Sequence, residues 1–478
     1  MCCGQLSIVK RTIEKRFMRI IDEIHAVVGT KGVLTGEDVR ARPNHSWWQG
    51  QCKAMAIVRP ASTEELSAVM RICHAHNQSV VPWGGLSGLV DGITCTGSDI
   101  VITLERMQAI EQLDDIAGVM TVQAGAIVQT VQDAAAAAGW LFAVDFGARG
   151  SAHIGGMIAT NAGGNSVVRY GMAREQVLGL EAVLADGTVI SSMNEMLKNN
   201  AGYDLKQLFI GSEGTLGIVT RAVLRLRPAP SATQTAFVAV ENFSSLLQVL
   251  RRLGTDLEGK LSAFEVMWNN HYQLLVEETR RHQAFLPTHH AFYVLVEAQG
   301  ADSETLEAQF TAVMAGLLED DHVVDAVIAQ SGQQADQLWA MRDDVEALVH
   351  CINPIAVFDV SLPIRHMESY INDLLAALEQ HCPGTRLVCF GHMGDGNLHL
   401  GIGPAHERHR IERIVYEHLV PLHGSVSAEH GIGLEKREFL HCSRSPAEIA
   451  LMRTLKQALD PKGLLNPGKV LPPTETTT

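Results

Sequence analysis

The chain has 478 residues, of which 46% are hydrophobic and 19% are charged, and this composition is typical of a large globular protein with about two to four domains. Its net charge of −15 argues against binding nucleic acid through a general basic field, although local arginines and a metal ion can reverse the field inside one cleft. Nine cysteines without a C-x-x-C pair argue against a disulfide framework and favour a reducing compartment, so we expect the cytoplasm or, in a eukaryote, the mitochondrial matrix.

The first half of the chain predicts short strands and helices separated by glycine-rich turns. A first helix is expected around Ile13–Val28. Ser62 and the acidic residues after Thr63 are typical of a helix start. The longest apolar stretch, Ala134–Val144, is too short to span a bilayer, so we expect no transmembrane segment. The predicted strands are Ala56–Arg59, Ser79–Val81, Ile100–Leu104 and Val119–Gln123, and the helices are Thr63–His76 and Ile127–Ala138.

The pattern changes after Pro228 and Pro230, which mark a plausible domain boundary. Beyond it, strands and helices alternate without glycine clusters, and this favours an antiparallel sheet with helices on one face. The predicted elements there are a strand at Ala236–Val240, a helix at Leu246–Leu253, a strand at Ala291–Glu297 and a helix at Ser303–Leu318.

Glycines gather at Gly84–Gly92, Gly147–Gly171 and Gly211–Gly217. The first cluster follows a strand, so its backbone N–H groups can approach an anion, but it matches neither G-x-G-x-x-G nor the P-loop, and a tight turn explains it equally well. The second cluster is too rich in glycine for a stable helix. We therefore expect something flat or phosphorylated to lie against it.

Histidines and a carboxylate recur near the end of the chain. His392 and His399 flank a Gly-Asp-Gly turn, and Glu429 precedes His430. Two imidazoles and one carboxylate suit Zn²⁺ or Mn²⁺ with a position left open for substrate. Spacing alone also fits unrelated surface histidines.

The three glycine clusters, in this order, resemble the FAD-binding half of the vanillyl-alcohol-oxidase-like flavoproteins. The run Lys198–Gly214 is similar to the branch of D-lactate, glycolate-oxidase and D-2-hydroxyglutarate dehydrogenases, and the resemblance spans Pro43 to Leu471. It implies an α+β fold with a two-subdomain FAD-binding domain of the vanillyl-alcohol-oxidase type and a substrate domain whose antiparallel sheet is covered by helices. We expect the FAD-binding domain at residues 1–229, the substrate and metal-binding domain at 230–440, and a segment at 441–478 that returns to the first domain.

The resemblance implies that the first glycine cluster binds the FAD pyrophosphate, that the second runs along the cofactor and that the third contacts the adenosine part. Some relatives tether FAD to a histidine in the first loop. No histidine stands at positions 82–88, so we expect non-covalent FAD. The implied cofactor-binding residues are Pro82, Gly84, Gly85, Leu86, Ser87, Gly88, Gly147, Ser151, His153, Gly155, Gly156, Asn161, Ala162, Gly163, Gly164, Glu213, Gly214, Ile218 and Asn466.

The same resemblance assigns the second group of motifs. It implies that His392, His399 and Glu429 bind a divalent metal, Zn²⁺ or alternatively Mn²⁺. His430 then matches the general base that deprotonates the substrate hydroxyl, while hydride passes to the flavin. Arg342 and Asn397 match substrate-binding positions. The implied reaction is oxidation of a small D-2-hydroxy acid to the 2-keto acid.

Three departures from the D-2-hydroxyglutarate members concern the substrate. Glu346 stands where they have Thr, Gly401 stands where they have Asn, and the sequence before Asp359 lacks their Lys. An uncompensated Glu346 would repel a second carboxylate. We therefore expect a neutral side chain, as in D-lactate, to be preferred over D-2-hydroxyglutarate.

Other functions of the same fold stay open. They are D-2-hydroxyglutarate oxidation, an oxidase that uses O₂, and a non-catalytic flavoprotein subunit; alkyl transfer is disfavoured by the paired histidines. We expect an electron-transfer flavoprotein as the acceptor, and a homodimer as the default assembly.

Overall fold

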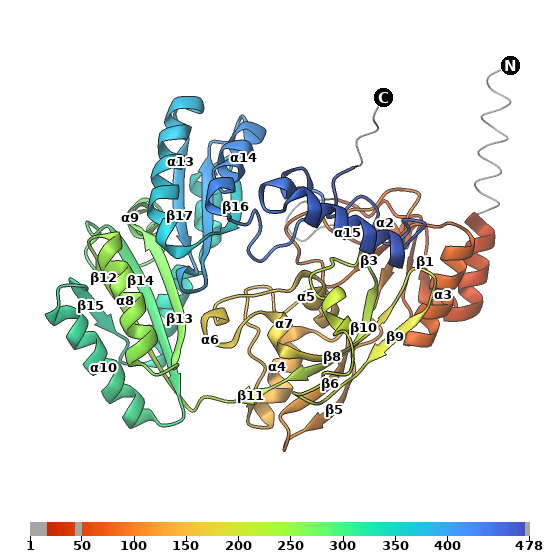
Figure 1. The fold of residues 1–478 in the computed structure, drawn as a ribbon, viewed down its shortest axis with the longest axis horizontal. Helices are drawn as coiled ribbons and strands as arrows, with labels where there is room; N and C mark the ends of the chain where they lie inside the picture. The colour runs from red at the N-terminus through yellow and green to blue at the C-terminus, as the bar shows by residue number, and fades with distance from the viewer. Residues whose placement is uncertain (1–16, 44–49, 474–478) are drawn as a thin grey trace.

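The computed structural model describes residues 17–43 and 50–473. Figure 1 shows two mixed regions side by side, with the seven-stranded sheet of the second half on one side and two smaller sheets of the first half on the other. Helical residues 17–28 confirm part of the helix expected around Ile13–Val28, and positions 13–16 lie outside the described residues. The seven cysteines among the described residues are free.

The first small sheet has the order β1-β2-β4-β3, in which β2, β3 and β4 run parallel. Its strands are β1 (Val33–Leu34), β2 (Ala56–Val58), β3 (Val80–Trp83) and β4 (Ile100–Thr103). Helix α3 (Thr63–Ala75) begins after Ser62, whose side chain accepts a hydrogen bond from Glu65 N as expected of an N-cap. Two shorter helices precede this sheet in part, η1 (Thr30–Gly32) and α2 (Glu37–Arg40).

The second small sheet is antiparallel, with the order β5-β6-β10-β8-β9. It shares one hydrophobic core with the first sheet, and α3 and α4 pack into that core. Its strands are β5 (Ile110–Asp114), β6 (Val119–Gln123), β8 (Val177–Val183), β9 (Val189–Ser192) and β10 (Ile218–Arg225), and β7 (Trp140–Leu141) pairs with β11 (Arg227–Pro228). The helices of this region are α4 (Val128–Ala137), α5 (Ile154–Thr160), α6 (Val167–Tyr170), α7 (Ala173–Gln176) and η2 (Leu205–Leu208).

The seven-stranded sheet is antiparallel and has the order β15-β12-β14-β13-β17-β18-β16. Its strands are β12 (Ala232–Val240), β13 (Leu261–Trp268), β14 (Phe292–Gly300), β15 (Asp325–Ile328), β16 (Ala356–Ser361), β17 (Arg386–Gly391) and β18 (Asn397–Gly403). In the β16–β18 pair, Asp359 lies opposite His399 and Val357 lies opposite Gly401. Because side chains alternate along a strand, these four residues share one face of the sheet.

Helices cover both faces of this sheet, so the expectation of helices on one face is wrong. On one face, α8 (Phe243–Asp256), α10 (Ser303–Glu319), α13 (Met367–His381) and α14 (Arg408–Glu417) share a core with the strands. On the other, α9 (Asn269–Gln273), η3 (Leu274–Glu278), α11 (Gly332–Arg342) and α12 (Val345–Cys351) pack on a smaller cluster. Strand residues of both faces are apolar here, as in a sheet buried on both sides, and period alone does not count the helices.

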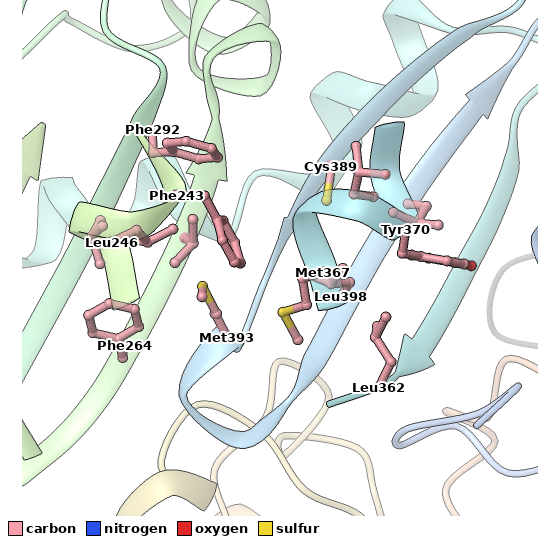
Figure 2. Close-up of a cluster of buried hydrophobic side chains, with 14 of the residues drawn as sticks. Phe243, Leu246, Phe264, Phe292, Leu362, Met367, Tyr370, Cys389, Met393 and Leu398 are labelled. Atoms are coloured by element: carbon pink, nitrogen blue, oxygen red, sulfur yellow. The ribbon is translucent and has the colours of Figure 1, made fainter. Parts of the chain in front are cut away.

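The larger core also anchors the turn between β17 and β18. That turn contains η5 (Met393–Asp395), and Met393 is fully buried in the cluster that Phe243, Phe264 and Met367 build. Figure 2 shows Met393 among these side chains. Since Met393 follows His392 directly, the core fixes the backbone that carries this histidine.

The end of the chain lies against the first region. Helix α15 (Pro446–Leu459) is drawn in dark blue beside β3 in Figure 1. Leu465 forms a parallel bridge with Val80, and Lys456 Nζ donates to Thr215 O over 2.8 Å. The remaining short helices are η4 (Ile364–His366), η6 (Val420–Leu422) and η7 (Arg437–Cys442). Over residues 17–43 and 50–473, none of the helices has the length and apolar character required to cross a membrane.

Candidate active site

The glycine clusters of the first half meet around α5. A Cβ built on Gly85 would lie 1.9 Å from Ser151 O, and one on Gly84 would lie 3.3 Å from the Cα of Gly156. The first cluster therefore packs backbone against backbone on the second, which only glycine permits. The result is a surface of main-chain groups with few side chains, which suits a flat, phosphorylated ligand.

The third cluster and the closing motif join the same surface. Glu213 N donates to Ala159 O at the end of α5 over 2.8 Å. Asn466 Nδ2 donates to Gly92 O over 3.1 Å and to Glu213 O over 2.9 Å. The name flavin cradle is used below for this arrangement of residues 82–92, 147–164, 211–218 and 466. All predicted cofactor-binding residues lie in these four segments.

Two polar atoms of the cradle are buried without a protein partner, namely His153 Nδ1 and Asn466 Oδ1. Burial lowers the pKa of His153, so its ring is neutral near pH 7. A Cβ on Gly88, Gly147 or Gly150 would meet no atom within 4 Å, so the cradle is open at these positions. Unpaired buried donors and acceptors beside an open glycine surface fit a cofactor with polar groups.

The β17–β18 hairpin brings His392 and His399 together, with 5.1 Å between their ring centroids. The loop after η6 adds Glu429, so that one ligand atom from each of the three residues lies within 4.8 Å of the others. Two imidazoles and a carboxylate at this separation are a suitable donor set for Zn²⁺ or Mn²⁺. Burial in particular holds the pKa of His399 well below its ordinary value, which keeps it neutral, as a metal ligand must be.

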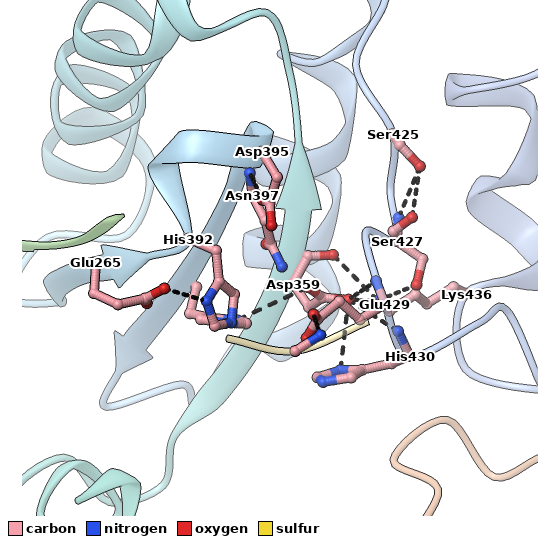
Figure 3. A network of polar contacts seen from close by, with 12 residues as sticks. Glu265, Asp359, His392, Asp395, Asn397, Ser425, Ser427, Glu429, His430 and Lys436 are labelled. Atoms are coloured by element: carbon pink, nitrogen blue, oxygen red, sulfur yellow. Dashed lines mark hydrogen bonds and ion pairs between the residues drawn. The ribbon is translucent and has the colours of Figure 1, made fainter. Parts of the chain in front are cut away.

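Sequence reasoning missed Glu265, a fully buried carboxylate on β13. Its Oε1 accepts from His392 Nδ1 over 2.8 Å, and its Oε2 accepts from Arg342 Nε over 2.8 Å. Burial works against the charge, yet Arg342 and His392 outweigh it and lower the pKa of Glu265 to about 2. The contact to Nδ1 leaves Nε2 of His392 as the nitrogen for a metal. Figure 3 shows Glu265 pointing at the His392 ring.

Arg342 lies beside the metal-ligand candidates but is not free. Its Nη2 is 3.2 Å from each ring nitrogen of His392 and 2.7 Å from Glu265 Oε2. Nη1 pairs with Asp343 over 3.2 Å. Asn397 is a different case, since both atoms of its buried amide lack a protein partner. Of the two predicted substrate-binding residues, Asn397 therefore has its full hydrogen-bonding capacity available.

A second buried carboxylate, Asp359 on β16, holds the backbone of the Glu429–His430 loop. Its Oδ2 accepts from Glu429 N over 2.9 Å and from His430 N over 3.1 Å, as Figure 3 shows. The side chain of His430 comes within 3.7 Å of the same oxygen, and Lys436 Nζ within 3.9 Å. His430, 28% exposed, thus lies at the open edge of the cluster, where it can meet a substrate.

Contacts from the flavin cradle reach this loop directly. Gly164 N donates to Glu429 Oε1 over 2.7 Å. In return, Glu213 accepts from Ile432 N over 2.6 Å and from Gly433 N over 2.8 Å. The metal-ligand candidates and the cradle therefore form one continuous site between the two halves of the chain.

The departures from the D-2-hydroxyglutarate pattern lie in two places. Val357 and Gly401 share a sheet face with His399 and Asp359, whereas Phe358 points into the core on the other face. Val357 is 54% exposed, so the wall next to the histidines is uncharged. Glu346 is not uncompensated, contrary to the sequence interpretation, because its carboxylate pairs with Arg281 over 2.9 Å. The two residues lie 65 positions apart, so the sequence pattern could not reveal the pair.

A weak signal for the missed carboxylates was present in the sequence. Glu265 and Asp359 are single acidic residues inside the apolar strands Leu261–Trp268 and Ala356–Ser361. A buried charge is rare unless it is paired or functional. Lys436, buried and within 3.2 Å of Ser427 Oγ, had no such signal, because its surroundings read as an ordinary loop.

Comparison with known proteins gives two family matches. Residues 54–192 match a family described as "FAD binding domain". Residues 229–470 match one described as "FAD linked oxidases, C-terminal domain". The two matches cover the glycine clusters and the histidine motifs respectively.

Similar sequences carry two kinds of name. A mitochondrial D-2-hydroxyglutarate dehydrogenase of Arabidopsis thaliana is 36% identical over 93% of this chain and 80% of its own. A D-2-hydroxyglutarate dehydrogenase of Xanthomonas citri pv. viticola is 39% identical over 87% of this chain and 89% of its own. A protein of Schizosaccharomyces pombe assigned by name as a mitochondrial D-lactate dehydrogenase is 39% identical over 87% of this chain and 82% of its own.

Solved structures share the fold at low sequence identity. An alkyldihydroxyacetonephosphate synthase superposes with a TM-score of 0.72 and 16% identity, covering 94% of this chain and 84% of the other. The 4-ethylphenol oxidase of Gulosibacter chungangensis gives a TM-score of 0.69 at 17% identity, covering 96% and 98%. The predicted α+β fold class is confirmed by these likenesses together with the sheets described above.

Proposed function

The chain belongs to the family of FAD-dependent D-2-hydroxyacid dehydrogenases, and from this premise we propose that it oxidises a D-2-hydroxy acid with an uncharged side chain at a metal-assisted site. The family makes it an oxidoreductase that binds FAD. The side-chain preference, the metal ion, the non-covalent attachment of FAD and the roles of single residues make up the proposal.

One observation carries the proposal more than any other. His392, His399 and Glu429 offer three ligand atoms within 4.8 Å of one another, and Glu429 accepts a hydrogen bond from Gly164 of the flavin cradle. A substrate held at these ligands therefore lies next to the cofactor surface. Buried acceptors without a partner, such as Asp359 Oδ1, give further support for a cation.

Bound FAD supplies the acceptor for the hydride of the carbinol carbon, and a divalent ion supplies Lewis-acid assistance to ionisation of the substrate hydroxyl. His430 takes the hydroxyl proton, since imidazole is suited to general base catalysis near neutral pH. Asp359 holds the His430 backbone N–H over 3.1 Å. That contact limits the movement of the base during proton transfer.

Arg342 and Asn397 bind the substrate carboxylate in this proposal. Arg342 is 3.2 Å from the His392 ring, close enough to face a carboxylate beside the metal ligands. Its positive charge also attracts the anion within an otherwise acidic chain. Asn397 offers an amide that no protein group uses, and Arg342 keeps its orientation through Glu265.

The uncharged wall of Val357 and Gly401 supports a neutral substrate side chain. D-2-Hydroxyglutarate is the second candidate, favoured by the names of relatives such as that of Xanthomonas citri pv. viticola. The ion pair between Glu346 and Arg281 also removes the repulsion that the sequence interpretation gave to Glu346. The preference for a neutral side chain therefore depends on Val357 and Gly401.

A substrate panel with an artificial dye acceptor tests the function. We expect D-lactate, D-2-hydroxybutyrate or D-mandelate to give a higher kcat/KM than D-2-hydroxyglutarate, and the L-forms to be inactive. A higher kcat/KM for D-2-hydroxyglutarate would make it the substrate class instead. Metal analysis of the same preparation is expected to find about one divalent ion per chain, the number a His₂-carboxylate site holds.

His430→Ala tests the base. Loss of a general base lowers kcat by about 10² to 10⁴-fold, with FAD and metal retained. Full activity of this variant at saturating substrate would remove His430 from the mechanism.

The electron acceptor completes the proposal. We assign this role to an electron-transfer flavoprotein, and peroxide release under air would identify an oxidase instead. The relatives of Arabidopsis thaliana and Schizosaccharomyces pombe are named as mitochondrial; we propose the matrix for a eukaryotic source and the cytoplasm for a bacterial one. Light scattering of the purified protein tests the homodimer.

A further inference from the structure

The loop of Ser427–Gly433 carries both Glu429 and His430, and two buried carboxylates hold its backbone. Asp359 accepts from the N–H groups of Glu429 and His430. Glu213 accepts from the N–H groups of Ile432 and Gly433. The two anchors come from opposite halves of the molecule, Asp359 from β16 and Glu213 from the flavin cradle. The stretch around His430 is therefore suspended between them.

The backbone of Glu213 is itself fixed to the cradle. Glu213 N donates to Ala159 O at the end of α5, and Glu213 O accepts from Asn466 Nδ2. Its φ of 52° lies in the left-handed region, where a residue other than glycine is uncommon. A specific conformation is thus retained that turns the carboxylate toward the loop instead of along the chain.

The loop approaches Glu213 more closely than a side chain would allow. A Cβ built on Gly431 would lie 2.8 Å from Glu213 Oε1, and one on Gly433 would lie 1.8 Å from Val90 O. Both glycines have positive φ. Leu434 N also donates to Val90 O over 2.9 Å, so the loop is seated on the first half of the chain directly after the histidine.

We propose that Glu213 is a positioning residue for His430 and Glu429, setting their distance from the flavin, and that its side chain is not a contact to the adenosine part of FAD. This inference rests on the proposed function of His430. Glu213 is almost completely enclosed, and both of its oxygens already accept from the loop amides. Burial raises the pKa of this carboxyl group, and the two amide donors oppose the rise.

The alternative role predicts a different response. A cofactor contact contributes to FAD affinity and leaves the chemical step unchanged once FAD is saturating. A positioning residue leaves FAD affinity unchanged and slows the chemical step, because a shift of about 1 Å can lower a rate by about 100-fold. FAD binding and flavin reduction therefore separate the two.

The test compares Glu213→Gln with the wild-type holoenzyme. Glutamine keeps the size but turns one acceptor into an NH₂ group, which faces a backbone N–H instead of accepting from it. Glu181→Gln is the matched control, because Glu181 is also a buried carboxylate of the first half, bonded to Thr63 and Thr220 and remote from the loop. Anaerobic stopped flow gives the rate of flavin reduction, and titration of the apoprotein gives the Kd of FAD.

For Glu213→Gln we expect flavin reduction at saturating substrate to slow by about 10- to 100-fold, with the Kd of FAD unchanged and kcat lowered more than KM is raised. Glu181→Gln is expected to reduce its flavin at the wild-type rate. A raised Kd of FAD with a wild-type reduction rate at saturating FAD would overturn the proposal. An equal slowing in both variants would also overturn it, because the effect would then belong to any buried carboxylate.

Hydrogen–deuterium exchange provides a readout that does not depend on activity. The amides of Ile432 and Gly433 are expected to exchange faster in Glu213→Gln than in the wild type, and at the wild-type rate in Glu181→Gln. Unchanged exchange in Glu213→Gln would contradict the anchoring of the loop. If the wild type reduced its flavin with no D-2-hydroxy acid, the proposed function would fail while faster exchange would still support the anchor.

Discussion

Glu429 Oε1 accepts a hydrogen bond of 2.7 Å from the backbone N–H of Gly164, across 265 positions of sequence. The carboxylate proposed to bind the metal is therefore also bonded to the proposed flavin-binding surface. Two oxygens of one carboxylate can serve both purposes at once. The cofactor and the metal thus depend on the position of the same side chain.

Replacing Gly163 should disturb the metal site from within the flavin cradle. A Cβ at this position would lie 2.8 Å from Glu429 Oε1, so Gly163→Ala is expected to displace the carboxylate and lower the bound metal per chain and kcat together. Gly254→Ala in α8, where a Cβ meets no atom within 4 Å, is the control. A metal content and kcat equal to the wild type in Gly163→Ala would refute the proximity argument.

Metal affinity should depend on FAD. If FAD orders the Gly164 segment, it also orders Glu429, and linkage then requires each ligand to raise the affinity for the other by the same factor, typically about 5- to 150-fold. Calorimetric titration of Zn²⁺ into the protein with and without FAD measures this factor. Identical Kd values would show that the two sites are independent.

Glu265 should be required for the metal and for stability. Glu265→Met leaves Arg342 buried without its counter-charge, a loss of about 3 to 5 kcal/mol, and it removes the acceptor for His392 Nδ1, which lowers metal affinity by about 10- to 100-fold. The double variant Glu265→Met with Arg342→Met should recover much of the stability but not the metal affinity. Chemical denaturation and metal titration measure the two effects. Wild-type metal binding in Glu265→Met would contradict the role of Glu265.

Substrate choice should respond to Val357. This side chain lies on the histidine-bearing face of the sheet and is 54% exposed, so Val357→Lys places a cation where a second carboxylate can reach it. We expect kcat/KM for D-2-hydroxyglutarate relative to D-lactate to rise by about tenfold, the factor for ~1.4 kcal/mol from one hydrogen bond to a charged group. Val357→Met controls for size, and an equal change in both variants would exclude a charge effect.

Acid should destabilise the protein through His271, which is stacked on Phe390 at 4.4 Å and has a buried Nδ1 without a partner. Burial lowers the pKa of His271 from 6.5 to about 3. As the pH falls below 6.5, the unfolded chain takes up the proton first, so stability decreases, by about 2 kcal/mol between pH 6.5 and 5. His271→Phe should make the free energy of unfolding less dependent on pH in this window. An unchanged pH dependence would mean that His271 does not contribute.

The sequence by itself determined the local chemistry of the site. The order of the glycine clusters carries the family resemblance. His392 and His399 converge because a seven-residue turn and hairpin link them, and Glu429 and His430 are neighbours in the chain. Such features need few residues and short separations, so they can be recognised from the pattern of letters.

Only the tertiary structure decided how these parts act together. His392 meets Glu265 across 127 positions, Glu213 meets Ile432 across 219, and Glu346 finds Arg281 across 65. Helices on both faces of the large sheet likewise follow from which strands become neighbours. Pairing between distant residues depends on the packing of whole sheets, and neither residue type nor periodicity records it.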